Sequence, residues 1–152
     1  MPSLESKVPP PALVVVMAVF MWLLSRATPS LHVDVPWHNW LAIFLVSVGF
    51  LTGLSGVATF RIAKTTVDPT KPRASSLVTW GVYTISRNPM YLGGLIMLLG
   101  WAIFLSNALA FLFLPVYVLY LNRFQIAPEE RVLRSLFGET YVAYQARAGR
   151  WL

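Results

Sequence analysis

The chain has 152 residues, of which 57% are hydrophobic and only 12% are charged, with a net charge of +6. Ordinary soluble domains carry about 25% charged residues, so the composition excludes a soluble fold and predicts that lipid covers part of the surface. A basic chain can bind nucleic acid or an anionic membrane. Here the charges flank long apolar runs, which is the membrane pattern, and we expect no nucleic-acid partner.

The first two apolar runs predict membrane-spanning helices at about residues 10–25 and 37–60. Pro10 can open the first helix because proline is tolerated in a first turn, and about 17 residues suffice to cross a bilayer. The second run begins at Trp37 and Trp40. Aromatic residues of this kind are typical of the membrane interface.

The third run, residues 90–122, contains 33 residues without a charge. As a single helix it would be roughly 50 Å long, against a hydrocarbon core of about 30 Å. Two spans at about residues 90–105 and 108–124 are the better interpretation, joined by a tight turn at Ser106-Asn107. These two spans would form a hairpin.

The basic residues support this count of spans. With four spans and both termini inside, eleven of the twelve basic residues lie on one side of the membrane, as the positive-inside tendency requires. These eleven are Lys7, Arg61, Lys64, Lys71, Arg73, Arg87, Arg123, Arg131, Arg134, Arg147 and Arg150. The sequence therefore predicts a cytoplasmic loop at residues 61–89 and a cytoplasmic tail at residues 125–152.

The tail has the features of short helices. Pro128 suits a first helical turn, and carboxylates follow it at Glu129 and Glu130, where they favour the helix dipole. Gly138 suits a helix end, and a second short helix follows it. We therefore expect one all-α integral membrane domain, residues 1–152, with about four transmembrane helices and short cytoplasmic C-terminal helices.

Polar chemistry is concentrated at the inner membrane face. Arg87 lies where the loop enters the third span, and Glu129 and Glu130 lie where the fourth span leaves the membrane. A hairpin makes these groups neighbours. Such a cluster can bind a zwitterion, with the arginine taking a carboxylate and a glutamate taking an ammonium or sulfonium group. Alternatively, the arginine only snorkels to the interface and the glutamates only stabilise a helix start.

The two histidines give no comparable signal. His32 and His38 lie in or beside the outer loop, six residues apart. That spacing permits metal binding in principle, but interfacial loop residues are the favoured interpretation, and we expect no metal. The absence of cysteine also excludes zinc–thiolate sites and cysteine nucleophiles.

Three ordered motifs resemble the isoprenylcysteine carboxyl methyltransferase family, in particular its small prokaryotic members. Part of the pattern is shared with the phospholipid N-methyltransferases. The resemblance covers roughly residues 60–152. The motifs are TTVDP at residues 65–69, LVTWGVYTISRNPMYLG at residues 77–93, and EER at residues 129–131 followed by FGETY at residues 137–141 and Tyr144.

The resemblance implies a multi-helix membrane fold, S-adenosylmethionine as methyl donor and a lipid-like or small hydrophobic acceptor. It implies cofactor-binding roles for Asn88, Pro89, Tyr91, Gly93, Glu129 and Glu130, and catalytic roles for Arg87, Arg147 and Glu130. Two departures stand out: asparagine at position 88, where eukaryotic members have histidine, and Ala148-Gly149 in place of a valine-proline pair.

Two other functions fit the same residues. A membrane reductase of the sterol reductase type would bind NADPH, and a non-catalytic scaffold would use the charged residues only as an interface. Within the methyltransferase reading, carboxylate, thiol and amine acceptors stay open, as does the oligomeric state. We expect a prokaryotic inner membrane, with membrane lipids as neighbours and both termini in the cytoplasm.

Overall fold

The structure, a computed structural model, describes residues 9–33, 36–65 and 76–152. Within these ranges every regular element is a helix. Three of the basic residues counted above (Lys7, Lys71 and Arg73) and residues 66–69 of the first motif lie outside the described residues.

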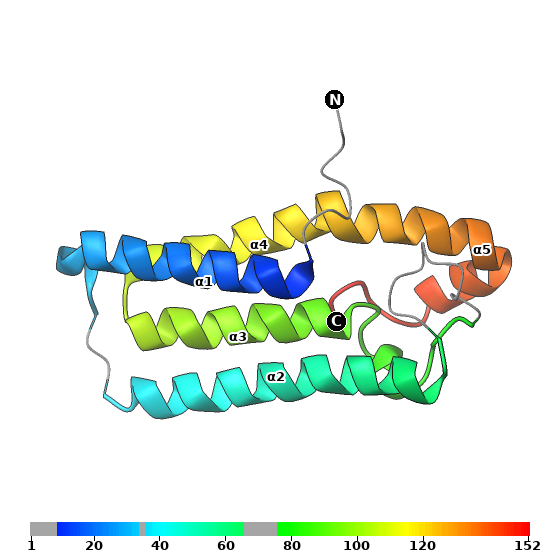
Figure 1. Cartoon of the computed structure of the whole chain (residues 1–152), viewed down its shortest axis with the longest axis horizontal. Helices are drawn as coiled ribbons and strands as arrows, with labels where there is room; N and C mark the ends of the chain where they lie inside the picture. The colour runs from blue at the N-terminus through cyan, green and yellow to red at the C-terminus, as the bar shows by residue number, and fades with distance from the viewer. Residues whose placement is uncertain (1–8, 34–35, 66–75) are drawn as a thin grey trace.

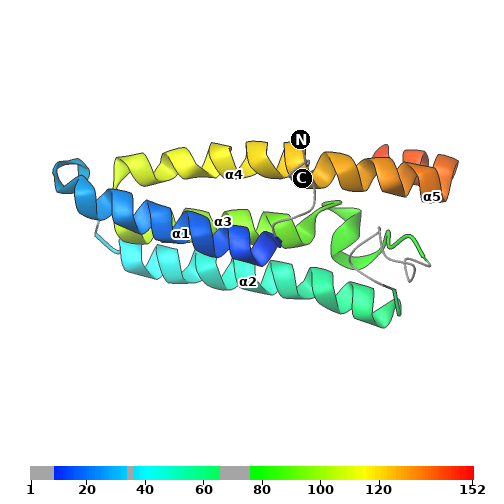
Figure 2. The same cartoon turned by 45° about the horizontal axis from the view of Figure 1, so that its top comes forward.

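The fold is a bundle in which one helix lies between the others (Figure 1). Its long helices are α1 (Pro10–Ala27), α2 (His38–Ile62), α3 (Pro89–Leu105), α4 (Phe113–Leu121) and α5 (Ala127–Gln145), with short 3-10 segments η1 (Pro29–Leu31), η2 (Gly81–Thr84) and η3 (Ala108–Leu112). Turning the molecule shows α3 between α2 on one side and α1 with α4 on the other (Figure 2).

The lengths and hydropathy of these helices fit a bilayer. Among the described residues, three helical stretches are long and apolar enough to cross a membrane, and α3 is a shorter apolar helix of 17 residues. Large apolar side chains point outward along the bundle, including Phe20, Trp40 and Leu51, which are 55%, 75% and 64% exposed. The prediction of an all-α integral membrane protein is confirmed.

Glycines let α2 and α3 pack backbone against backbone. A Cβ atom at Gly93 would lie 2.5 Å from the carbonyl oxygen of Gly49 and 2.8 Å from the amide nitrogen of Gly53. Small residues at such crossings allow the close approach on which helix association in membranes depends. Gly93 therefore serves helix packing in this structure.

The hydroxyl groups of α2 are satisfied inside the helix. Ser47, Thr52 and Thr59 donate to the carbonyl oxygens four residues earlier at 2.7–2.8 Å. Because lipid offers no hydrogen-bond partner, this back-bonding removes the cost of placing hydroxyls in the membrane.

The hairpin turn between α3 and η3 lies at Ser106-Asn107, as predicted. Ser106 adopts a left-handed conformation with φ of 50°, which ends α3. The Asn107 side chain is buried, accepts from the amide of Leu109 at 3.0 Å and donates to the carbonyl oxygen of Thr28 at 2.9 Å. The asparagine thus stabilises the turn and holds it against the end of α1.

The sequence did not predict that the fourth span continues into the tail. A π-helical turn, η4 (Asn122–Ile126), joins α4 to α5 without a break (Figure 1), and the amide of Ala127 bonds back to the carbonyl oxygen of Asn122. Proline has no amide hydrogen to donate, and the wider turn before Pro128 keeps the chain helical. Gly138, with φ of 49° and ψ of −126°, then kinks α5 into two parts.

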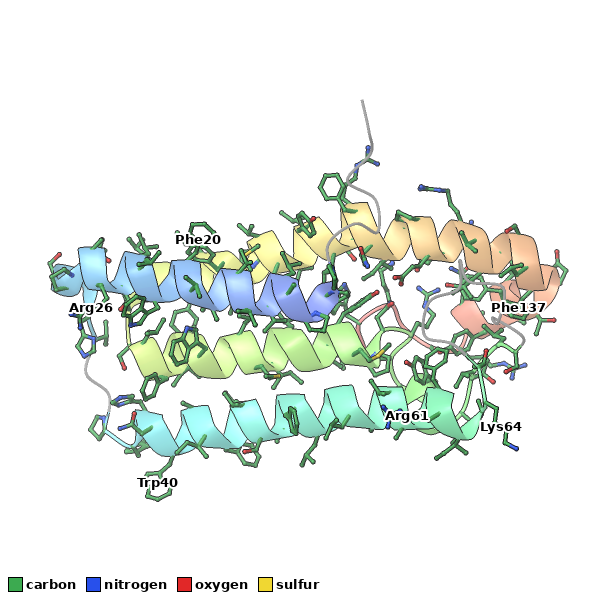
Figure 3. The ribbon with its side chains drawn as sticks, viewed as in Figure 1. Phe20, Arg26, Trp40, Arg61, Lys64 and Phe137 are labelled. Carbon is green, nitrogen blue, oxygen red and sulfur yellow. The ribbon has the colours of Figure 1, made fainter. Side chains whose placement is uncertain are left out.

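Beyond the bundle, α5 and the segment before α3 enclose a second, smaller core. Its buried residues are Val78, Tyr83, Tyr141, Tyr144 and Ala148. The bundle end that carries this core also carries Arg61, Lys64 and Phe137, whereas Arg26 lies at the opposite end (Figure 3). The charge asymmetry that the sequence indicated is therefore present between the two ends.

Candidate functional site

The chain entering α3 and the chain leaving α5 meet at this end of the molecule. The amide of Arg87 donates to the carbonyl oxygen of Gly149 at 2.9 Å. The side chain of Asn88, the residue before α3, donates to the carbonyl oxygen of Arg150 at 2.9 Å. These contacts fix the position of Arg87 at the rim of the smaller core.

A carboxylate lies between two arginines at the centre of the site. Glu130 is 9% exposed. Arg150 donates two hydrogen bonds to this carboxylate: Nε lies 3.1 Å from Oε1 and Nη2 lies 2.6 Å from Oε2. Arg87 approaches the same carboxylate, with Nη2 at 3.4 Å from Oε1. A forked contact of this kind fixes orientation as well as charge.

The second carboxylate is held from α3. The phenol of Tyr91 donates to Oε1 of Glu129 at 2.6 Å. Because Tyr91 lies in the first turn of α3 and Glu129 near the start of α5, this bond ties the two helices together. The two adjacent glutamates therefore engage different parts of the molecule.

A cavity of about 70 Å³ lies between these groups. Its walls are both apolar and polar. They comprise Phe60, Ser76, Leu77, Val78, Tyr83, Arg87, Asn88, Met90, Tyr91, Ile126, Glu129, Glu130, Leu133, Phe137, Tyr141 and Tyr144. Apolar walls with a few convergent polar groups are typical of small-molecule sites.

Two residues that line this cavity carry buried hydrogen-bond donors without a partner among the described residues. These atoms are Nε and Nη1 of Arg87 and the hydroxyl of Tyr83. Buried polar groups are nearly always paired in folded proteins, so unpaired donors beside a cavity indicate the place of a bound acceptor group. An arginine with free N–H groups suits a carboxylate in particular.

The surroundings of Tyr83 keep its phenol protonated, so that its hydroxyl can donate a hydrogen bond. Burial raises the pKa of the Tyr83 phenol well above its ordinary value, and the nearby Tyr144 and Glu129 raise it further. Its ring also packs edge-on against Phe60, with centroids 5.2 Å apart. Tyr83 is therefore a neutral, positioned hydroxyl at neutral pH.

The structure brings together most of the residues that the sequence singled out. Arg87, Asn88, Tyr91, Glu129 and Glu130 all line the cavity. Their proximity follows from the hairpin, as the sequence predicted.

Three of the singled-out residues lie elsewhere. Pro89 is buried at the start of α3 and Gly93 packs against α2, while Arg147 is exposed. None of the three lines the cavity. Arg147 lies just beyond α5 with an exposed side chain, and the catalytic role that the resemblance implies for it stays a prediction.

Sequence reasoning missed Arg150, and it quoted Tyr83 and Tyr144 only as parts of motifs. Arg150 takes the position on Glu130 that a cationic ligand group was expected to take. Tyr144 donates to the carbonyl oxygen of Tyr83 at 2.7 Å, which holds the segment before α3. Tyr83 was quoted in the second motif, but only the fold shows that its hydroxyl reaches the cavity.

The residues present fit S-adenosylmethionine in chemistry. That molecule carries a carboxylate, an ammonium group, a sulfonium centre and an aromatic base. The cavity offers Arg87 and Tyr83 for an anion, two carboxylates for cationic groups and aromatic walls for a base. Its volume in this arrangement, about 70 Å³, is below the roughly 300–1,000 Å³ of typical ligand pockets.

Parts of this chain are similar to two known proteins. A 63-residue stretch, 41% of this chain, is 46% identical to an uncharacterized protein of Haemophilus influenzae along that protein's whole length. A 71-residue stretch, 47% of this chain, is 39% identical to protein-S-isoprenylcysteine O-methyltransferase B of Arabidopsis thaliana, but spans only 36% of the plant protein.

A family model covers much more of the chain. The model of the phospholipid methyltransferases matches residues 37–140, which is more than half of the sequence and includes α2, α3, α4 and most of α5. The cavity walls fall mainly inside this range. Together these findings show that the chain belongs to the phospholipid methyltransferase family and is a membrane methyltransferase of that type.

Proposed function

We propose that the protein transfers a methyl group from S-adenosylmethionine to a lipophilic acceptor at the cytoplasmic face of a prokaryotic inner membrane. The single observation that carries the proposal is the cavity with unpartnered donors on Arg87 and Tyr83 beside Glu129 and Glu130. Family membership supplies the reaction class.

The orientation rests on charge. Arg61, Lys64, Arg87 and the basic residues of α5 lie at the cavity end, and Arg26 lies at the other. The positive-inside tendency assigns the basic end to the cytoplasm. A soluble cofactor then reaches the cavity from the cytoplasm, and a lipophilic acceptor reaches it from the bilayer.

When bound, S-adenosylmethionine supplies a methyl group on a sulfonium sulfur, and the carbon–sulfur bond breaks as the acceptor atom bonds to carbon. The protein's task is to align the reactants and to exclude water. Arg87 would bind and orient the carboxylate of the cofactor through Nε and Nη1, which have no partner among the described residues. Glu130 orients Arg87 in turn, since its carboxylate lies 3.4 Å from Nη2.

We favour a carboxylate among the three acceptors left open by the sequence. With Arg87 on the carboxylate of the cofactor, the Tyr83 hydroxyl, which stays protonated, remains to donate to an acceptor group. An amine acceptor would instead need a carboxylate, and of the two in the cavity wall Glu130 is already in a forked contact with Arg150. The match to a protein named as an isoprenylcysteine O-methyltransferase agrees with this preference.

Calorimetry on the detergent-purified protein tests the cofactor. We expect saturable binding of S-adenosylmethionine and S-adenosylhomocysteine, and no binding of NADPH under the same conditions. Binding of NADPH alone would favour a reductase. A folded protein that binds none of the three would contradict the proposal.

A further inference from the structure

An open apolar groove lies between α1 and α2, away from the cavity. Both helices pack on α3. The groove has Val15 and Val19 of α1 on one side, Val46 of α2 on the other and Leu98 of α3 at its base. Its volume is about 500 Å³, and every side chain that lines it is apolar. A groove of this kind in a membrane protein suits a hydrocarbon chain.

The groove adjoins a more polar pocket at the end of the bundle opposite the cavity. Trp22 and Trp101 line both hollows, and the pocket, of about 690 Å³, adds Ser25, Arg26 and His32. Figure 3 shows Arg26 at this end of the molecule. The two hollows together match a molecule that has a hydrocarbon chain and a polar head.

The tryptophan at the junction of the two hollows is fixed in place. The indole of Trp101 donates to the carbonyl oxygen of Ala18 at 3.0 Å, which ties α3 to α1. Its ring stacks on that of Phe104, with centroids 5.3 Å apart. Indole rings are typical of the depth at which lipid headgroups meet acyl chains. The junction therefore lies where a lipid changes from polar to apolar.

The cation in the pocket lacks a countercharge. Arg26 is exposed and forms no ion pair with a carboxylate of the described residues. The carboxylates that the structure describes, Glu129, Glu130 and Glu139, all belong to α5. Asp34 lies outside the described residues. A guanidinium suits phosphate oxygens, and the surroundings favour an anionic head over a zwitterionic one.

The segment that carries His32 is held against the hairpin turn. The amide of Val33 donates to the carbonyl oxygen of Ser106 at 2.7 Å, and the Asn107 side chain donates to the carbonyl oxygen of Thr28 at 2.9 Å. An imidazole can donate a hydrogen bond to a phosphate oxygen. Because its backbone is already fixed, this rim loses little conformational entropy when a ligand binds.

We propose that an anionic glycerophospholipid occupies this site. Its phosphate lies on Arg26 and His32, and one of its acyl chains lies in the groove between α1 and α2. Basic pockets between transmembrane helices are known sites for anionic headgroups. The site is separate from the cavity at Arg87 and requires neither a methyl donor nor a methyl acceptor.

Native mass spectrometry of the delipidated protein in detergent tests the headgroup. The probes are dioleoyl phosphatidylglycerol and dioleoyl phosphatidylethanolamine, which share their acyl chains and differ in charge. We expect the protein to retain one phosphatidylglycerol with about tenfold preference, and Arg26→Gln to remove this preference, since a charge-assisted hydrogen bond is lost. An unchanged preference in Arg26→Gln would overturn the proposal.

Arg61→Gln is the matched control. Arg26 and Arg61 are both exposed and each is the basic residue in the last turn of its helix, α1 and α2 respectively. Both substitutions therefore remove the same charge and the same interaction with a helix dipole. Arg61→Gln should keep the preference for phosphatidylglycerol. An equal loss in both variants would show that general charge attracts the lipid and that the site does not exist.

A second pair of variants tests the acyl chain. Val19→Trp places a large ring in the groove, whereas Val16→Trp adds the same ring to a neighbouring position that does not line it. The two valines are 48% and 45% exposed, so neither change disturbs the core. Val19→Trp should weaken retention of phosphatidylglycerol about tenfold, and Val16→Trp should not. Equal retention by the two variants would contradict the placement of the chain.

Thermal unfolding supplies an independent readout. A ligand that binds only the folded protein raises its stability, so phosphatidylglycerol should raise the Tm of the wild-type protein more than phosphatidylethanolamine does. Arg26→Gln should unfold at the same Tm with either lipid, and unfolding without lipid checks that each variant is folded. Equal shifts with both lipids in the wild-type protein would mean ordinary bilayer neighbours and would contradict the proposal. Neither measurement includes a methyl donor, so failure of the proposed methyl transfer leaves this result intact.

Discussion

Arg87→Gln should lower the affinity for S-adenosylhomocysteine about ten- to a hundredfold and abolish methyl transfer. The substitution removes two buried, unpartnered donors from the cavity wall, and hydrogen bonds to charged groups are worth about 1.5–3 kcal/mol. Calorimetry measures the first effect, and radiolabelled methyl transfer measures the second.

Arg87 is a suitable position for this test because its replacement leaves no buried carboxylate without a positively charged partner. Glu130 keeps its forked contact with Arg150, whereas replacing Glu130 would leave Arg87 without a countercharge at high cost to folding. Arg123→Gln is the matched control, since Arg123 is exposed in η4 and does not line the cavity. Equal binding by both variants, with unchanged thermal unfolding, would show that Arg87 holds no ligand.

The second large effect concerns the fold. Gly93→Ala should destabilise the protein in detergent by about 1–3 kcal/mol, because the new methyl group would meet the backbone of α2 at Gly49 and Gly53. Backbone atoms cannot rotate away as a side chain can, so the two helices would have to separate. Thermal unfolding followed by circular dichroism measures the loss.

Gly53→Ala is the control for that experiment, and its expected sign is opposite. A Cβ atom at Gly53 meets nothing within 4 Å, and alanine is favoured over glycine in a helix by roughly 0.5–1 kcal/mol. Gly53→Ala should therefore be neutral or stabilising. A stabilising Gly93→Ala would contradict the close helix contact.

The sequence was sufficient to predict those features of the fold that the thickness of the bilayer determines. Length against membrane thickness required a turn in the uncharged third run, and the structure has it at Ser106-Asn107. Once that hairpin is accepted, Arg87 and Glu130 have to be neighbours, and their side chains are 3.4 Å apart. Both inferences depend on dimensions that do not vary with packing.

The sequence did not predict contacts that depend on a single backbone dihedral angle or on the register of a few residues. Arg147 and Arg150 are three residues apart beyond the end of α5, and which of them reaches Glu130 depends on the turn at Gly149 and the kink at Gly138. Neither angle can be read from residue type alone.

The continuous helix before Pro128 could not be predicted from the sequence for a similar reason. A proline at that point suits a new helix as well as it suits a wide turn within a continuing one, and only the structure distinguishes the two. Gly93 likewise lies within a motif of the resemblance, and its packing role follows only from the position of α2.

The most direct test of the account is methyl transfer itself. Purified protein would be incubated with methyl-labelled S-adenosylmethionine and a lipid extract of bacterial membranes, and the organic phase counted before and after mild base. The account predicts label in a lipid-soluble product, lost in Arg87→Gln, and released by base as methanol because a carboxylate acceptor gives a methyl ester. No transfer by folded protein that binds S-adenosylhomocysteine would contradict the proposed reaction, and base-stable label would contradict the carboxylate acceptor.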